Sequence, residues 1–214
     1  MSDLTPLYDA AAQALVDAPP AHDLAHVRRV VHNVELLCAQ TEADAAIAVP
    51  AAVLHELVNL PKNHPDSHRS GDLCAEAARA LLRQLNWPEE RAEAVARCIA
   101  EHAWSKGAAP TSLEAAVLQD ADRLDAIGAI GVARCMAVCG ELNRPLYSPE
   151  DPLAHQRELD DRRFGLDHFF KKLLRIDERL NTDAARALAA PRLQFLRQFV
   201  DQLASELGVE AQRA

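Results

Sequence analysis

The chain has 214 residues, of which 49% are apolar and 4% aromatic, so it can bury a core and is not a disordered tail. Its 23 Lys and Arg against 32 Asp and Glu give a formal net charge of −9, which argues against a surface for duplex nucleic acid. Twelve prolines and only seven glycines favour helices over a turn-rich β protein. We therefore expect an all-α helical bundle that forms one domain over residues 1–214.

The cysteines and the apolar segments indicate where the protein resides. Five cysteines lie in apolar helical stretches and not in loop-rich pairs, so we interpret them as small core residues. Residues 1–17 lack a basic start followed by an apolar run. No segment approaches the ~18 uncharged apolar residues that a membrane span needs. These features predict a soluble, cytoplasmic protein that does not enter a membrane.

The first two predicted helices are separated by a pair of prolines. A helix begins at Thr5 with a proline in its first turn, and its apolar spacing ends at Pro19. A second helix of about four turns begins after Asp23, where apolar residues recur at i, i+3, i+4 and i+7. His26 lies beside this apolar stripe and is expected to face the interior.

A third helix is expected to open at Pro50, because proline is favoured in the first helical turn. It would carry His55 and Glu56 near its end. Two further helices are predicted at 74–85 and 88–102, the second of which opens on acidic residues that the helix dipole favours.

The second half of the chain contains the longest predicted helix. Thr111 and Glu114 match a T-x-x-E capping box ahead of an apolar helix expected at 115–139. An acidic cluster interrupts it, and Gly128 and Gly131 predict close contact with a neighbouring helix. Two amphipathic stretches at about 166–180 and 183–207 close the chain.

Charged groups in apolar surroundings are the chemically informative feature, since burying an unpaired ion costs several kcal/mol unless a partner or a metal compensates. His26 lies among valines, the His55-Glu56 pair follows an apolar run, and Asp122 lies inside an apolar stretch. Two imidazoles with carboxylates form a nitrogen and oxygen set that suits Mn, Fe, Co, Ni or Zn better than calcium. The alternative is neutral core histidines bonded to carbonyls, with Asp122 and Asp125 paired to arginines.

The order His26, His55-Glu56, Asp122 resembles the H…HD…D signature of the HD-domain superfamily of metal-dependent phosphohydrolases. Longer stretches are similar to the single-domain bacterial branch typified by the YpgQ and YedJ proteins: 22–30, 54–63, 101–102, 119–131 and 168–174. The resemblance covers about residues 20–205. It implies an all-helical bundle with one divalent metal ion held by His26, His55, Glu56 and Asp122. It also implies hydrolysis of a phosphate ester or anhydride, with a nucleoside triphosphate or monophosphate as the expected substrate.

Position 56 departs from the family signature, which has Asp where this chain has Glu. Glutamate keeps the carboxylate and adds a methylene, so it can ligate from a slightly greater distance or bind a water instead. A second hypothesis is therefore a catalytically weak, metal-stabilised module that binds or senses a nucleotide.

The segment His22-Asp23-x-x-His26 also resembles the H-E-x-x-H motif of zinc proteases. That interpretation is disfavoured, because a protease needs an acid long enough to act as general base and His22 falls at the start of the helix. We expect His22 and Asp23 to form a helix cap with an orienting hydrogen bond to the site.

Three residues are expected to take part in the chemistry. A bound metal would activate a water, and Glu56 or Asp125 would accept its proton. His102, which the resemblance places at the pocket, would neutralise charge that develops on the phosphate. The alternatives are an ion pair of Asp125 with Arg123 or Arg134, and a helix-end His102 favoured by the helix dipole.

Two lysines complete the expected substrate site, together with His102. Lys62 follows the metal pair in a polar loop, where its ammonium could hold an anionic leaving group. Lys172 matches a His-x-x-x-Lys-Leu-Leu pattern of the family, although the neighbouring Lys171 is an alternative. A solvated lysine is the structural alternative for Lys62. The substrate would be a small phosphorylated molecule, and Mg²⁺ could accompany it.

Overall fold

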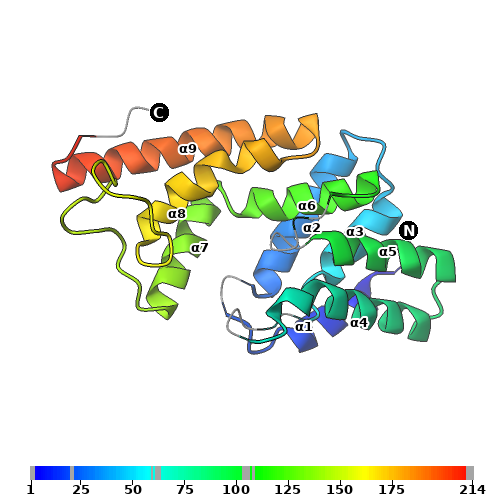
Figure 1. Cartoon of the computed structure of the whole chain (residues 1–214). Helices are drawn as coiled ribbons and strands as arrows, with labels where there is room; N and C mark the ends of the chain where they lie inside the picture. Colours follow the sequence, from blue (N-terminus) through cyan, green and yellow to red (C-terminus); the bar gives the residue numbers. More distant parts are fainter. Residues whose placement is uncertain are drawn as a thin grey trace. The chain divides into compact units, whose positions relative to one another are not determined.

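The computed structural model describes residues 3–19, 22–58, 60, 64–102, 107 and 109–210 (Figure 1). Every regular element within these ranges is a helix, which confirms the all-α expectation. The chain divides into two compact units, which are described separately below. The first comprises Met1–Asp122 with Asn181–Ala185, and the second comprises Arg123–Leu180 with Arg186–Ala214. A single functional domain over the whole chain stays a prediction.

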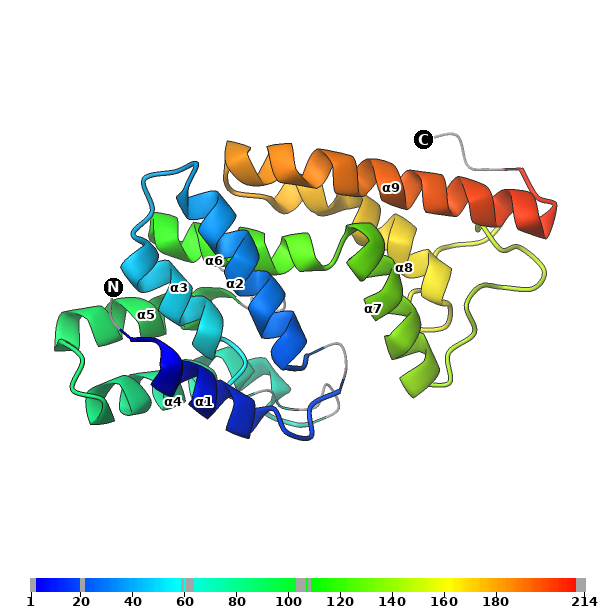
Figure 2. The ribbon, with the colours of Figure 1, turned by 180° about the vertical axis from the view of Figure 1, so that it is seen from behind.

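The first unit opens with three helices: α1 (Thr5–Ala14), α2 (Leu24–Cys38) and α3 (Ala45–Leu54). Helix α3 contacts both α1 and α2, as the view from behind shows (Figure 2). Helix α2 begins where its sequence predicts, because the Asp23 carboxylate accepts a hydrogen bond from the His26 N–H at 2.9 Å. This cap fixes the first turn of α2 and therefore the backbone position from which the His26 side chain extends.

The start of α3 corrects the expectation that it opens at Pro50. Asp44 caps the helix, accepting a hydrogen bond from the Ala46 N–H at 2.8 Å, and Pro50 lies inside the helix. A proline interior to a helix removes one N–H donor and usually bends or ends the helix. Here the buried, apolar surroundings of Pro50 and the Asp44 cap outweigh that preference.

The end of α3 also differs from the expected helix. The last helical residue is Leu54, so His55 and Glu56 lie in the turn that follows and not on the helix itself. Both side chains are still buried. The turn therefore presents them from one short segment whose direction is set by the end of α3.

Two helices of similar length, α4 (Ser70–Gln84) and α5 (Glu89–His102), follow a 3₁₀ turn at Ser67–Arg69. Helix α4 packs along α5, and α5 also contacts α3. The boundaries agree with the predicted helices to within a few residues. His102 is the last residue of α5, which is the position that the sequence predicts for it.

Helix α6 (Leu113–Asp125) begins without the predicted capping box. The Ser112 hydroxyl accepts a backbone N–H of the first turn at 3.2 Å, so the capping residue lies one position later than Thr111. The Glu101 carboxylate instead binds the N–H and hydroxyl of Thr111, at 2.9 and 2.7 Å. Glu114 accepts the Asp44 N–H at 3.0 Å. Both members of the expected box are thus engaged elsewhere.

The predicted helix at 115–139 is two helices, α6 and α7 (Gly128–Glu141). Gly128 adopts φ +75°, a left-handed conformation that glycine reaches without strain and other residues rarely adopt. A Cβ on Gly131 would lie 2.2 Å from the Ala126 oxygen, so the chain can turn tightly only with glycine there. A Cβ on Gly128 would lie 3.2 Å from the Arg192 Cβ, which bears out the expected close contact.

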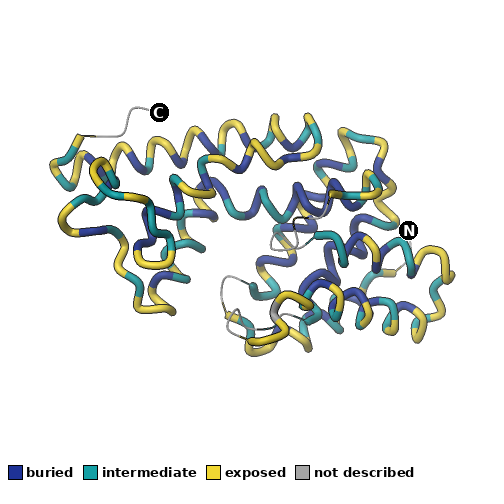
Figure 3. The backbone as a smooth tube through the Cα atoms, in the orientation of Figure 1, coloured by how far each residue is buried: buried dark blue, intermediate teal, exposed yellow. Residues whose placement is uncertain are grey.

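The second unit also contains α8 (Gly165–Lys171), a 3₁₀ segment η3 (Leu173–Arg179) and most of α9 (Asp183–Leu207). Helix α7 contacts α8, which contacts η3. Buried residues recur along one side of α9 while its other residues are exposed or half-buried (Figure 3). The two predicted amphipathic stretches therefore form helices.

No helix in the described ranges is both long enough and apolar enough to cross a membrane. All five cysteines are free thiols. Cys74, Cys98 and Cys139 are buried, as expected of core residues, whereas Cys38 and Cys135 are only half-buried, which corrects the expectation for these two. Burial raises the pKa of Cys74 to about 12, so this thiol stays protonated and acts as a small apolar residue. The cytoplasmic location stays a prediction.

Candidate metal centre

The four predicted metal ligands lie together in the first unit. His26 comes from α2, His55 and Glu56 from the turn after α3, and Asp122 from α6. His26 Nε2 lies 3.2 Å from His55 Nε2, 3.6 Å from Asp122 Oδ1 and 3.7 Å from Glu56 Oε1. Ligands at about 2.1 Å from one ion are roughly 3 to 4.2 Å apart, so the three distances from His26 Nε2 are those of ligands to a common divalent ion.

The donor set also fits such an ion chemically. His26 and His55 are 0% and 2% exposed, whereas the Asp122 side chain is 29% exposed. Two imidazole nitrogens with two carboxylate oxygens match the preference of Mn, Fe, Co, Ni or Zn. The group His26, His55 and Asp122 has its ligand atoms within 4.8 Å of one another, and so has the overlapping group His22, His26 and Glu56.

His55 is held in the form that binds a metal. Its Nδ1 donates to the Ala52 carbonyl oxygen at 2.7 Å, because that oxygen can only accept. The Nε2 lone pair is then directed at His26. Burial lowers the pKa of His55 to about 4, so the ring is neutral near pH 7. A carbonyl partner on the distant ring nitrogen is the usual way in which proteins orient a metal-binding histidine.

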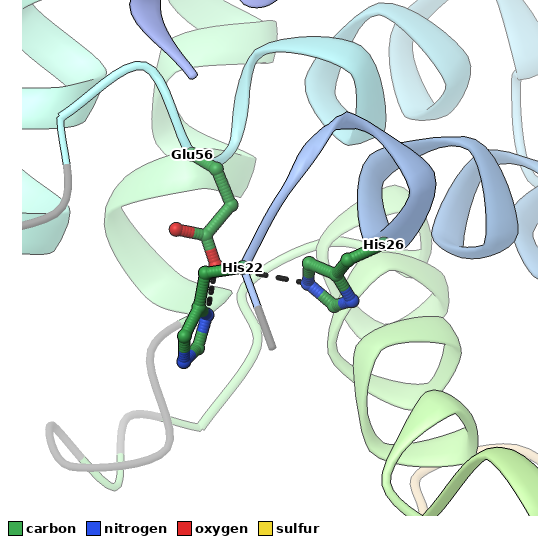
Figure 4. A group of neighbouring side chains, drawn as sticks. All are labelled: His22, His26 and Glu56. Atoms are coloured by element: carbon green, nitrogen blue, oxygen red, sulfur yellow. Dashed lines mark hydrogen bonds and ion pairs between the residues drawn. The ribbon is translucent and has the colours of Figure 1, made fainter. Parts of the chain in front are cut away.

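Glu56 directs one carboxylate oxygen at three imidazoles. Its Oε1 lies 3.1 Å from His22 Nδ1, 3.7 Å from His26 Nε2 and 3.8 Å from His55 Nε2. Figure 4 shows the carboxylate with its partners His22 and His26. Burial alone would raise the pKa of Glu56, but the hydrogen bond from His22 and the neighbouring imidazoles of His26 and His55 hold it well below its ordinary value. The carboxylate is therefore ionised, as a metal ligand must be.

His22 and Asp23 take the roles that the sequence predicts. Asp23 caps α2, and His22 forms a hydrogen bond to Glu56 in the site. The Asp23 carboxylate is engaged by the backbone N–H of His26, so it does not stand as a general base beside a zinc ion. This geometry disfavours the protease interpretation.

His102 lies beside the cluster. Its ring centroid is 5.3 Å from that of His55, in an edge-to-face arrangement. Its Nδ1 donates to the Ile99 carbonyl oxygen at 2.5 Å, which leaves Nε2 as the nitrogen for a ligand or a phosphate. His22, His26, His55 and His102 thus form a row of imidazoles, with neighbouring centroids 5.8, 5.2 and 5.3 Å apart.

Asp125 and Lys172 belong to the second unit. Asp125 accepts a hydrogen bond from Arg134 at 2.9 Å, which is the structural alternative considered for it. Lys172 Nζ lies 2.9 Å from Asp161 Oδ2. Their catalytic and substrate-binding roles stay predictions. Lys62 lies outside the described residues, so its role is likewise untested.

Asp161 is a partly buried carboxylate that sequence reasoning missed. Besides Lys172, it binds Lys171 at 3.1 Å and His168 at 3.2 Å. Asp161 lies in a loop, and no sequence pattern predicts which residues of the following helix a loop aspartate will contact. Only the neighbouring basic residues His168, Lys171 and Lys172 could have suggested an acidic partner.

The helical fold and the converging histidines and carboxylates define a protein of the HD-domain class. The HD-domain family pattern matches residues 23–127, and the chain belongs to this family. It is 34% identical over 203 residues to the uncharacterised protein YpgQ of Bacillus subtilis (strain 168), covering 92% of this chain and 91% of YpgQ.

Solved structures agree with this assignment. The structure of Bacillus subtilis YpgQ in complex with ADP superposes with a TM-score of 0.72 at 30% identity, covering 94% of this chain and 97% of that one. An HD-superfamily hydrolase from Bacillus thuringiensis superposes with a TM-score of 0.73 at 29% identity, covering 97% of each chain. A Lactobacillus plantarum protein gives a TM-score of 0.75 at 31% identity, covering 97% and 98%.

Proposed function

We propose that this protein is a metal-dependent phosphohydrolase that acts on a nucleotide. The observation that carries the proposal is the convergence of His26, His55, Glu56 and Asp122 from separate segments of the first unit. Membership of the HD-domain family supports the hydrolytic activity, and the ADP complex of YpgQ supports the substrate class. We further propose that one divalent transition ion, Mn, Fe, Co, Ni or Zn, occupies the site.

A divalent ion held there would polarise a phosphoryl oxygen and make a water more acidic. The ionised Glu56 carboxylate would accept the proton of the attacking water through Oε2, because Oε1 faces the imidazoles and would bind the ion. His102 would direct Nε2 at a phosphate oxygen, since Nδ1 is occupied by Ile99. Charge neutralisation by donors of this kind is the main catalytic requirement of phosphoryl transfer.

We also propose that Lys62 and Lys172 contact the phosphates and that Asp125 assists the proton transfer. In Lys172 the ammonium is already paired with Asp161, so a phosphate would compete with that carboxylate. Asp125 is paired with Arg134 and would act only where that pair opens. In a chain of net charge −9, a nucleotide accompanied by Mg²⁺ would suffer less repulsion than the free anion.

The test combines metal analysis with a hydrolysis screen. The chain is purified without chelator, its metal content is measured, and phosphate and pyrophosphate release from nucleoside mono-, di- and triphosphates is followed with Mn²⁺. We expect about one ion per chain and turnover of at least one nucleotide. His55→Ala should abolish both, while His32→Ala, an exposed histidine on α2, should retain both.

A second candidate function is a nucleotide-binding module without turnover, because the family signature has Asp where this chain has Glu56. The same experiment separates the two. Nucleotide binding at full metal occupancy with no product released would support the binding module and contradict the hydrolase.

A further inference from the structure

His22 contacts the metal cluster without being one of the four ligands. Its Nδ1 lies 3.1 Å from Glu56 Oε1, and Figure 4 shows this carboxylate between His22 and His26. The same oxygen lies 3.8 Å from His55 Nε2. Since a carboxylate oxygen can only accept, the proton of this hydrogen bond is on Nδ1. A protonated nitrogen has no lone pair for a metal. His22 therefore acts on Glu56, and not on an ion through this nitrogen.

The backbone that carries His22 is fixed on both sides. The His22 N–H donates to the Pro19 carbonyl oxygen at 2.8 Å. The next residue, Asp23, is the N-cap of α2 and binds the His26 N–H. The side chain itself has only two rotatable bonds, so few rotamers compete with the one that meets Glu56.

Glutamate at position 56 needs such a partner more than aspartate would. Its extra methylene adds a rotatable bond, and each additional freely rotating bond makes one ligating orientation less populated. The Glu56 carboxylate is 10% exposed, and the hydrogen bond from His22 selects the rotamer in which Oε1 faces both buried imidazoles.

We propose that His22 is a positioning residue that holds Glu56 Oε1 toward the metal ion, so that glutamate can serve as a ligand at position 56. The proposal rests on the metal centre proposed above. It assigns His22 a function that depends on Glu56, whereas a direct ligand or a structural residue would act without it.

The experiment measures Mn²⁺ binding to the full chain, stripped of metal, by isothermal titration calorimetry. His22→Ala removes the donor and should weaken Mn²⁺ affinity about 10- to 100-fold, the usual loss when a hydrogen-bond partner of a metal ligand is removed. His22→Asn places an amide nitrogen where Nδ1 stands and should bind within about threefold of the parent. His32→Ala is the matched control on α2 and should bind as the parent does.

The dependence on Glu56 is tested in a second background. In Glu56→Ala, adding His22→Ala should cause no further loss of Mn²⁺ affinity, because the partner is gone. Circular dichroism and thermal melts of the metal-free variants show whether each is folded. A His22→Asn variant as weak as His22→Ala overturns the proposal, and so does an equal loss in the Glu56→Ala background.

The number of Mn²⁺ ions bound per chain distinguishes a positioning role of His22 from direct ligation by His22. If the parent binds two ions and His22→Ala binds one, His22 is itself a ligand, with His26 and Glu56, and the proposal is wrong. A parent that binds Mn²⁺ but hydrolyses no nucleotide contradicts the proposed function alone, and the affinities of the His22 variants still decide this proposal. A parent that binds no Mn²⁺ overturns both.

Discussion

At the scale of single residues, Glu56 is the carboxylate to which we assign two roles. Its Oε1 is within 4 Å of three imidazole nitrogens, and the proposed ligation and proton acceptance both require the ionised carboxylate. We expect Glu56→Gln to lower Mn²⁺ affinity and nucleotide hydrolysis strongly, by about 100-fold or more, because an amide ligates weakly and accepts no proton. Glu56→Asp should keep or raise activity with at least one metal. Steady-state kinetics with Mn²⁺, Co²⁺ and Ni²⁺ test both variants, and a Gln variant as active as the parent would remove Glu56 from the site.

Asp161 allows a prediction on pH dependence. Burial alone would raise its pKa, but hydrogen bonds from Lys172, Lys171 and His168 hold it well below its ordinary value of 3.8. A carboxyl whose pKa is lower in the folded state stabilises the fold above its unfolded pKa, and this stabilisation is lost as the pH falls through the folded pKa. Asp161→Asn should therefore destabilise the protein by about 1 kcal/mol near pH 7, a modest amount because both lysines are well exposed.

The measurement is urea unfolding of parent and Asp161→Asn between about pH 7 and pH 3. The difference between them should be constant above about pH 5 and shrink below about pH 4. It should also shrink in salt, since the partners are solvated. A difference that grows on acidification would show that the lysines do not stabilise the ionised carboxylate.

Some features of single residues could be predicted from the sequence and others could not. That His26, His55 and Asp122 lie close together could be predicted, because polar side chains inside apolar runs require a partner. Their role as metal ligands stays a prediction. The specific contact of His22 with Glu56 could be anticipated only as a hydrogen bond to the site. It depends on the direction of the turn after α3, which no local pattern shows.

At the scale of elements, the start of α9 is held by a carboxylate from α6. Asp120 is fully buried and accepts from the backbone N–H and side-chain amide of Asn181, at 2.8 and 2.9 Å. Its other oxygen accepts from the N–H and hydroxyl of Thr182, at 2.9 and 2.8 Å. We expect Asp120→Ala to lower the free energy of unfolding by about 2 to 4 kcal/mol, because the backbone N–H groups of Asn181 and Thr182 and the Thr182 hydroxyl lose this acceptor.

Chemical denaturation measures this effect. The control is Asp201→Ala, which removes an exposed aspartate of α9. It should change stability by less than about 0.5 kcal/mol. If Asp120→Ala is as stable as this control, water replaces the carboxylate without cost and the contact does not anchor α9.

Element boundaries followed from the sequence where a cap was unambiguous and failed where two signals competed. The Asp23 cap of α2 was predicted, whereas the Asp44 cap of α3 was overlooked because Pro50 offers the same first-turn signal. The break between α6 and α7 depends on the backbone conformation of Gly128, since a glycine within an apolar run also suits a continuous helix. These errors moved helix ends, while His26 and His55 are still buried.

At the scale of the whole molecule, the candidate metal centre joins elements that are far apart in the sequence. An ion bound by the four ligands would tie α2, the turn after α3, and α6 together, so it stabilises the folded state by mass action. Mn²⁺ at a hundredfold excess over its Kd should add about 2.7 kcal/mol and raise the Tm by several degrees. His55→Ala should show no such rise, although its metal-free Tm also falls because of the lost buried ring.

Differential scanning calorimetry with and without Mn²⁺ and chelator tests this expectation, and His32→Ala serves again as the control. A metal-dependent rise in Tm that persists in His55→Ala would place the ion elsewhere.

The helical class of the molecule followed from composition and periodicity alone. The division into two compact units did not, because α6 runs across the boundary and no change in composition marks it.

The order of the ligands along the chain has a consequence for folding kinetics. His26 and Asp122 stand near opposite ends of the first unit's sequence, so the site can assemble only after the helices between them have docked. Contacts that form late contribute little to the folding transition state and mainly slow unfolding. We therefore expect an ion in this site to leave the refolding rate almost unchanged and to lower the unfolding rate. The ion would bind after the folding transition state and would have to dissociate before the chain can unfold.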